Sequence, residues 1–332
     1  MGKYMLRRIG LMLVTLVAIS FVTFWIIQLP PGDYVSTIVA QAEARGEVIT
    51  PEQMAALRAR YGLDDPFLVQ YWNWISNIIF HGDFGQSFAW NRPVSTLIWD
   101  RVALSFFLSI STLLFVWAVA FPIGIYSAVK QYSPGDYVAT FFGFVGMAIP
   151  DFLLALFFLW LGVRHFDQSA GGLFSPEYVD AAWNLGKVLD LASHLWLPIL
   201  IIGLSGTAGL IRITRANLLD ELYKPYVITA RAKGLPEWKL LLKYPVRMSL
   251  SPFFSTIGWL LPGLISGETI ISIVLSLPTT GPLLFGGTLS QDMYLVGSFI
   301  LILSTLTVIG TLISDLVLAW WDPRIRRRYQ ES

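Results

Sequence analysis

Six stretches of the chain are apolar over nearly their whole length, and polar or charged segments separate them. A helix that spans a bilayer needs about 20 predominantly apolar residues, and all six stretches are close to this length or longer. The pattern predicts an all-α polytopic membrane protein with six transmembrane helices. The predicted spans are residues 9–29, 102–129, 138–163, 195–213, 252–277 and 296–321, with a break expected around His194.

The first apolar stretch follows Lys3, Arg7 and Arg8, as the core of a signal peptide would. It is longer than the 7–15 residues typical of such a core. The residues after it, 30–33 (Pro-Pro-Gly-Asp), do not form a small-x-small cleavage site. Residues 1–29 are therefore interpreted as a cytoplasmic N-terminus and a retained first span.

The positive-inside rule orients the six spans. With the N-terminus in the cytoplasm, sixteen Lys and Arg residues lie on the cytoplasmic side and seven on the opposite side. This places both termini in the cytoplasm. Residues 30–101 form an extracytoplasmic helical loop, and residues 102–332 form the core of spans two to six. That core includes a basic cytoplasmic loop at 214–251 and a cytoplasmic tail at 322–332.

Composition removes several classes of function. Only 14% of the residues are charged, against about 25% in a soluble domain, and 55% are hydrophobic. The net charge of +1 gives no field that would attract nucleic acid. The chain has no cysteine, and its three histidines lie far apart, so we expect no catalytic residues and no bound metal.

The basic loop has a defined local pattern. Pro225 suits the first turn of a helix, Gly234 suits a helix end, and Pro236 follows it as a stop. This predicts two short helices with a turn between them. The loop could rest on anionic lipid headgroups or dock onto a soluble partner. The glycine turn favours docking, because lipid contact requires no such turn.

Within this loop, Thr229-Ala230-Arg231-Ala232-Lys233-Gly234-Leu235 resembles the cytoplasmic signature of ABC importer permeases of the dipeptide/oligopeptide/nickel group. Three other stretches resemble the same group and extend the likeness over almost the whole chain. They are residues 7–8 through 29–33, residues 61–64 through 82–87, and residues 322–326.

The resemblance implies the ABC type I importer permease fold and a function. The chain would be a permease subunit in a bacterial inner membrane, forming half of a solute pathway that works by alternating access. It implies three kinds of partner: a related second permease, one or two ATP-binding subunits that hold ATP and Mg²⁺, and an extracytoplasmic binding protein. The ATPase-docking residues would be Tyr226, Thr229, Ala230, Arg231, Ala232, Lys233, Gly234 and Leu235.

The sequence agrees with the assignment of ATP binding and hydrolysis to separate subunits. No G-x-x-x-x-G-K-[ST] phosphate loop is present, so we expect this subunit to bind no cofactor and to catalyse no hydrolysis. Two positions depart from the group. The acidic start of the general signature is replaced by Ile228, and residues 272–281 differ from the run expected of peptide permeases. The solute therefore remains either a peptide or an oligosaccharide.

Three acidic residues fall within the apolar stretches. Ionisable residues in a span are costly and suggest function, so Glu268, near mid-membrane, and Asp151 are candidates for the solute pathway. Asp151 follows Pro150 and could equally cap backbone groups that the proline leaves free. Asp315 lies close to a membrane surface, where pairing with a nearby arginine is the favoured interpretation.

Two other classes of function compete with the permease. A secondary carrier or channel would need a filter loop, a charged relay or inverted repeats. An intramembrane enzyme would need a nucleophile and base, or paired carboxylates, within the spans. Neither pattern is visible in the sequence.

Overall fold

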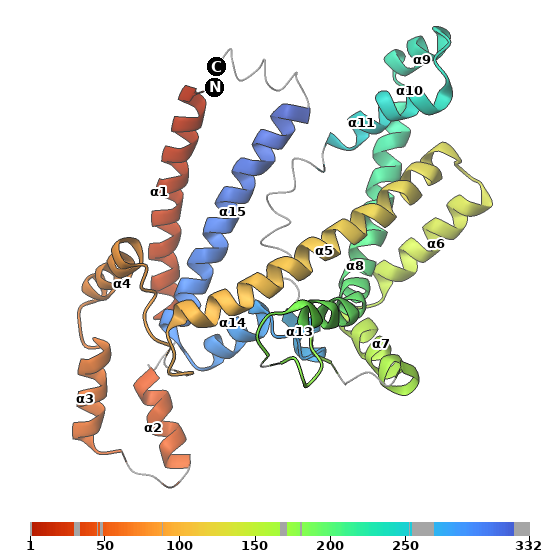
Figure 1. Cartoon of the computed structure of the whole chain (residues 1–332). Coiled ribbons are helices and arrows are strands. Elements are labelled where there is room, and N and C mark those ends of the chain that lie inside the picture. The colour runs from red at the N-terminus through yellow and green to blue at the C-terminus, as the bar shows by residue number, and fades with distance from the viewer. Residues whose placement is uncertain are drawn as a thin grey trace. The chain divides into compact units, whose positions relative to one another are not determined.

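The structure is a computed structural model that describes residues 2–29, 34–44, 46, 49–87, 89–166, 171–179, 181–251, 253 and 269–321. These residues are mainly helical, and they contain no β-strand beyond an isolated bridge between Gln86 and Pro93 (Figure 1). The predicted all-α architecture is confirmed. The chain divides into two compact units, one of residues 1–103 and 280–309, the other of residues 104–279 and 310–332.

Among the described residues, four helices are long and apolar enough to cross a bilayer. These are α1 (Gly2–Ile27), α5 (Val94–Val129), α8 (Leu185–Leu222) and α15 (Met293–Trp321). Helices α5 and α8 begin before the predicted spans, and α8 also continues beyond its predicted end. The break expected around His194 is wrong. Helix α8 runs through this residue, and His194 Nδ1 lies 2.8 Å from the Asp190 carbonyl oxygen within the same helix.

The third predicted span is two helices. Helix α6 (Pro134–Ala148) and helix α7 (Asp151–Phe166) meet at an angle of 99°. The residue before a proline is disfavoured in the α region, and Ile149, which precedes Pro150, is extended with φ −90° and ψ 123°. Counted as one span, this pair is a fifth candidate. The predicted span at 252–277 lies mostly outside the described residues, which include α13 (Thr269–Val274).

The first unit holds three helices from the segment after α1, and α14 (Thr280–Leu289). Within the helical loop predicted at 30–101, the described residues form α2 (Tyr34–Ala44), α3 (Pro51–Tyr61) and α4 (Phe67–His81). Aromatic rings join α1 to α4, with Phe24 stacked on buried Trp74 at 5.4 Å between centroids.

A buried carboxylate ties the segment after α4 to the start of α15 in this unit. Asp292 accepts a hydrogen bond from the Ser87 hydroxyl at 2.6 Å and one from the Ala89 N–H at 3.1 Å. Its other oxygen accepts the N–H of Leu295 at 3.1 Å, which caps the helix. Buried Val94, Ile98, Leu283, Leu295 and Phe299 pack beside it.

The second unit packs around α8. Its largest core joins α5, α7, α8 and α13 through residues such as Leu108, Leu154, Ile201 and Ile271. A smaller cluster, Ala128, Leu218 and Val246, holds the end of α8 against α5 and α11 (Pro245–Ser249). At this end, α8 leads into the basic loop.

Candidate functional site

The basic loop after α8 folds as the predicted pair of short helices, α9 (Pro225–Ala232) and α10 (Glu237–Lys243). Pro225 occupies the first turn of α9, where its missing N–H costs nothing. The turn depends on Gly234, which has φ +75° and donates its N–H to the Arg231 carbonyl at 3.0 Å. Only glycine adopts this left-handed conformation at no steric cost. The helix–turn–helix prediction is confirmed.

A small core of their own holds the two helices together. Val227, Ala230 and Leu240 are buried between them, and Leu235 and Tyr244 pack against these three. Ala230 and Leu235, which were predicted to contact a partner, therefore face inward. The other predicted docking residues remain exposed: Tyr226, Thr229, Arg231, Ala232, Lys233 and Gly234.

An ion pair joins α9 to α10 at the surface. Arg231 Nε lies 2.6 Å from Glu237 Oε1, and Arg231 Nη2 lies 3.3 Å from Oε2. Hydrogen bonding to the guanidinium holds the pKa of Glu237 below its ordinary value, and the same bond raises the pKa of Arg231. The loop is thus held by a core, a glycine turn and a charged contact, and it presents a defined surface.

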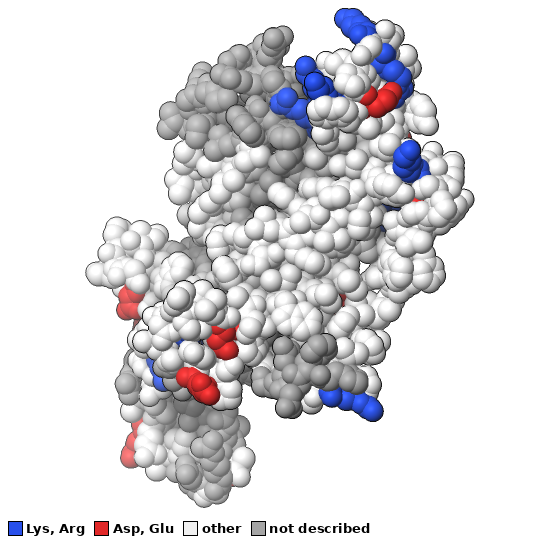
Figure 2. All heavy atoms as spheres, turned by 45° about the vertical axis from the view of Figure 1, so that its right-hand side comes forward, with Lys and Arg blue, Asp and Glu red and all other residues white. Residues whose placement is uncertain are grey.

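That surface combines cations with large apolar groups. Lys and Arg side chains gather near the top of the view in Figure 2, where α9 and α10 lie in Figure 1. Trp238 is 62% exposed and Leu242 is 60% exposed. They are four residues apart and so share one face of α10, opposite Leu240. The sequence analysis did not single them out, although this spacing around Leu240 could have indicated an exposed apolar face.

A second polar cluster lies where α6 begins, and the sequence analysis missed it. Asp136 is 2% exposed and accepts hydrogen bonds from Arg215 Nε and Nη2 of α8, both at 2.9 Å. The Tyr132 N–H at 2.9 Å and the Ser127 hydroxyl also donate to this carboxylate. Ser133 caps α6, with Asp136 as its third residue. This pattern of a helix start, visible in the sequence, could have indicated the position of Asp136 in the first turn.

The candidate pathway residues are only partly described. Asp151 is the half-buried first residue of α7. Among the described residues, no hydrogen bond or ion pair to its carboxylate is found, so the capping interpretation gains no support. Glu268 and the side chain of Asp315 lie outside the described residues. Within the described ranges, no group of three or more His, Asp or Glu side chains could hold a metal ion.

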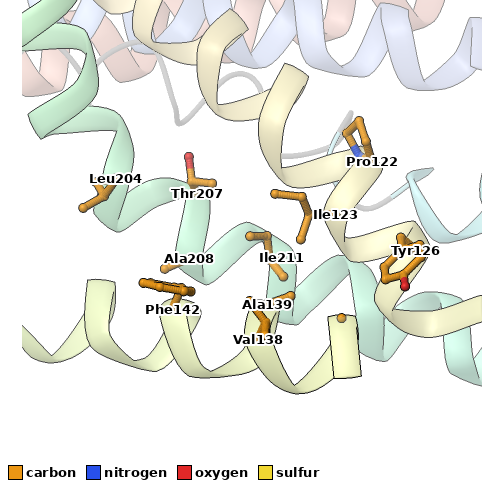
Figure 3. A pocket seen from close by; sticks show the side chains of 12 residues that line it. Pro122, Ile123, Tyr126, Val138, Ala139, Phe142, Leu204, Thr207, Ala208 and Ile211 are labelled. Carbon is orange, nitrogen blue, oxygen red and sulfur yellow. The ribbon is translucent and has the colours of Figure 1, made fainter. Parts of the chain in front are cut away.

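A cavity of about 580 Å³ lies between α5, α6 and α8 (Figure 3). Its wall is apolar apart from Tyr126 and Thr207, with Ile123, Phe142 and Ile211 among the contributors. Such a wall offers little to recognise a charged or strongly polar solute. The lining therefore gives no reason to place the solute in this cavity.

Comparison with known proteins covers nearly the whole chain. Residues 120–327 match the family described as binding-protein-dependent transport system inner membrane component. Residues 1–110 match the N-terminal region described for such transport system membrane components.

Individual relatives align over their full length. The chain is 32% identical to the oligopeptide transport system permease protein AppB of Bacillus subtilis, over 98% of the chain and 99% of that protein. It is 31% identical to the peptidoglycan transport system permease protein YejB of Agrobacterium fabrum, over 98% of each. It is 29% identical to the dipeptide transport system permease protein DppB of Escherichia coli K12, over 99% of the chain and 100% of that protein.

Proposed function

We propose that this chain, which belongs to the family of binding-protein-dependent transport system inner membrane components, carries a peptide-type solute as a permease subunit of an ABC importer. It would receive motion from its partners through the α9–α10 loop. The relatives named for oligopeptide and dipeptide transport support the peptide class. Because another relative is named for peptidoglycan transport, a solute that contains sugar units is also compatible with the family. A secondary carrier or channel finds no such support.

The proposed partners follow from the family's description. A solute-binding protein would deliver the solute, a related second permease would complete the pathway, and separate subunits would bind ATP and Mg²⁺. Hydrolysis would then take place outside this chain. The α9–α10 loop would face the cytoplasm with both termini, as the excess of Lys and Arg on that side predicts.

The structure of the loop carries the docking proposal. A loop that already has its bound conformation loses less entropy on binding than a disordered one. The core of Val227, Ala230 and Leu240 and the turn at Gly234 provide that order. Exposed Trp238 and Leu242 supply the large apolar contacts on which interface affinity concentrates.

Two carboxylates are the proposed contacts for solute within the membrane. Asp151 lies at the bend between α6 and α7, and Glu268 falls within the fifth predicted span. Ionisable residues in spans mark pathways by default, because their burial in lipid is costly. Replacing each by its amide should raise the solute concentration needed for half-maximal uptake. Unchanged uptake by Asp151→Asn or Glu268→Gln would remove that residue from the pathway.

The docking proposal is tested by co-purification with the ATPase subunits. Gly234→Val places a β-branched residue at positive φ, which distorts the turn between α9 and α10. The recovery of ATPase subunits per permease should fall roughly tenfold, which corresponds to about 1.4 kcal/mol of binding free energy.

Gly82→Val is the matched control. Gly82 also ends a helix at positive φ, +64°, and a Cβ at either glycine would meet nothing within 4 Å. The two substitutions therefore impose similar backbone strain at different places. The control should retain the ATPase subunits. Equal loss in both variants, or loss in neither, would contradict docking through the α9–α10 loop.

A further inference from the structure

We propose that the Asp136–Arg215 pair is a positioning element that makes α6 move together with α8, the helix that carries the docking loop. The inference rests on the proposed function, because it concerns how motion imposed at that loop reaches the membrane-spanning helices. Neither residue is proposed to touch the solute.

The pair is built as a rigid joint. Arg215 uses two nitrogens on the two oxygens of Asp136, each at 2.9 Å. Such a bidentate contact fixes orientation as well as distance. The Ser127 hydroxyl and the Tyr132 N–H bind the same carboxylate from the end of α5 and from the turn before α6. Because Asp136 is buried, little water can substitute for these donors.

Helix α8 connects this joint directly to the docking loop. Arg215 lies seven residues before the end of α8 at Leu222, which is about 10 Å along a helix axis. Pro198, the proline inside α8, lies on the far side of Arg215 from the loop. Helix α9 begins at Pro225, after Tyr223 and Lys224. A displacement that passes from the loop through Tyr223 and Lys224 to Leu222 therefore reaches Arg215 through uninterrupted helix.

Helix α6 also packs directly on α8, beyond the ion pair. A Cβ added to Gly146 of α6 would lie 3.3 Å from the Ala208 Cβ of α8, so the two helices are in close contact there. The 580 Å³ cavity beside Val138 and Phe142 is lined by α5 and α8 alike (Figure 3), and Gly135 at the start of α6 lies against the Tyr126 ring of α5. Helix α6 is thus held to α8 by both a small-residue contact and the ion pair.

The bend between α6 and α7 is the segment that this motion would displace. Helix α6 ends at Ala148, and α7 begins at Asp151, the proposed pathway residue. If α6 follows α8, a displacement at the docking loop changes the position of this bend. The ion pair then links the surface that receives the motion to the segment that contacts the solute.

The first test measures solute transported per ATP hydrolysed by the complete reconstituted importer. Arg215→Lys keeps the positive charge but loses the bidentate geometry. The ratio should fall roughly fivefold or more, while the ATPase subunits remain bound. Arg212→Lys is the matched control, because Arg212 lies one turn away on α8, is exposed, and has no ion-pair partner among the described residues. Its ratio should equal that of the wild type.

The second test measures the distance between α6 and the end of α8. The chain has no cysteine, so cysteines introduced at Tyr137 on α6 and Tyr223 after α8 give two specific sites for spin labels. These side chains are 62% and 74% exposed. In the wild-type importer, the distance between the labels should stay the same with and without trapped ATP. In Arg215→Lys, the distance distribution should broaden or shift when ATP is trapped.

The outcomes separate this inference from the docking proposal. If the ATPase subunits bind the wild type but its label distance changes with ATP, α6 does not follow α8 and the inference is overturned. An Arg215→Lys importer that transports the normal amount of solute per ATP hydrolysed overturns it too. So does a variant that yields less assembled importer but transports the normal amount of solute per ATP in each complex. If the ATPase subunits never bind the wild type, docking fails first and the positioning role fails with it.

Discussion

The two units of this protein each bury an aspartate, and they satisfy its charge in different ways. Asp292 in the first unit is 0% exposed and Asp136 in the second is 2% exposed. The bonds described for Asp292 come from neutral donors, namely the Ser87 hydroxyl and the N–H groups of Ala89 and Leu295. Asp136 has similar neutral donors and, in addition, the guanidinium of Arg215.

The two aspartates differ in the groups that would remain without a partner if the carboxylate were removed. Neutral donors that lose an acceptor are unsatisfied but uncharged. An arginine that loses its carboxylate is a charge without compensation, and because only 26% of the Arg215 side chain is exposed, water replaces that partner incompletely and the loss is more costly. The first arrangement suits a structural cap, here of α15. The second suits a joint that must hold two helices in one relative orientation.

The largest effect should follow from breaking the pair at Asp136. Asp136→Asn leaves Arg215 without its counter-charge, and we expect a loss of about 3–5 kcal/mol in the free energy of unfolding. The measurement is thermal or denaturant unfolding of the purified chain in detergent micelles. Low yield of folded protein at the growth temperature would be the same effect seen in cells.

A double substitution sharpens this prediction. Asp136→Leu combined with Arg215→Met removes both charges and keeps much of the volume. Replacement of a whole buried pair by apolar residues is often close to neutral. The double variant should therefore be more stable than Asp136→Asn. If the two are equally unstable, the effect at this site comes from packing and the stated contrast with Asp292 is wrong.

Asp292→Ala should cost less, about 1–3 kcal/mol, because it removes a helix cap and leaves only neutral donors unsatisfied. Its effect should be confined to the first unit. Hydrogen exchange of the amides at the start of α15, Leu295 among them, should become faster, whereas exchange near Asp136 should not change. A loss as large as that of Asp136→Asn would remove the distinction between the two aspartates.

Ser87→Ala tests a single donor of the same cluster. The Ser87 hydroxyl donates to Asp292 and accepts the Trp90 N–H at 3.2 Å. Its removal should cost about 1 kcal/mol, the usual net value of one hydrogen bond. Ser76→Ala, at an exposed hydroxyl that bonds only within α4 among the described residues, is the control and should cost less.

Much of the fold could be predicted from apolar periodicity alone. Uniformly apolar stretches of span length have few alternatives to helix, and the α9–α10 turn was indicated by Pro225, Gly234 and Pro236. The same periodicity cannot detect where a helix bends sharply. Ile149 and Pro150 lie within an apolar stretch on both sides, so the 99° angle between α6 and α7 was missed. The extension of α8 past Ile213 was missed because its last residues are polar.

The buried polar clusters could not be predicted because each pairs residues distant in sequence. Ser87 and Asp292 are 205 positions apart, and Asp136 and Arg215 are 79 apart. In one sequence, Arg215 is indistinguishable from the other cations that orient the spans. For the docking loop, sequence could identify the segment. It could not tell that Ala230 faces inward, because that depends on how α10 folds back over α9.

The smallest effect should come from the exposed pair Arg231–Glu237, which completes the comparison because both its partners are solvated. Screening by water and salt makes such a pair weak. The guanidinium lowers the pKa of Glu237 from its ordinary value of 4.5 in the folded loop. A group with a lowered folded pKa stabilises above its unfolded pKa and loses that contribution as pH falls through the folded value. The contact should therefore be intact at pH 7 and weaken only below about pH 4.5.

A fluorophore on a cysteine introduced at exposed Lys233 can measure this, since the chain has no other cysteine. Its anisotropy should be constant from pH 7 to pH 5 and fall at more acidic pH as Glu237 becomes protonated and the turn between α9 and α10 gains freedom. In Glu237→Gln the anisotropy should be slightly lower throughout and show no such step. A step of equal size in that variant would assign the titration to another group. A large fall already near pH 6 would mean that the loop depends on charge far more than its buried core of Val227, Ala230 and Leu240 implies.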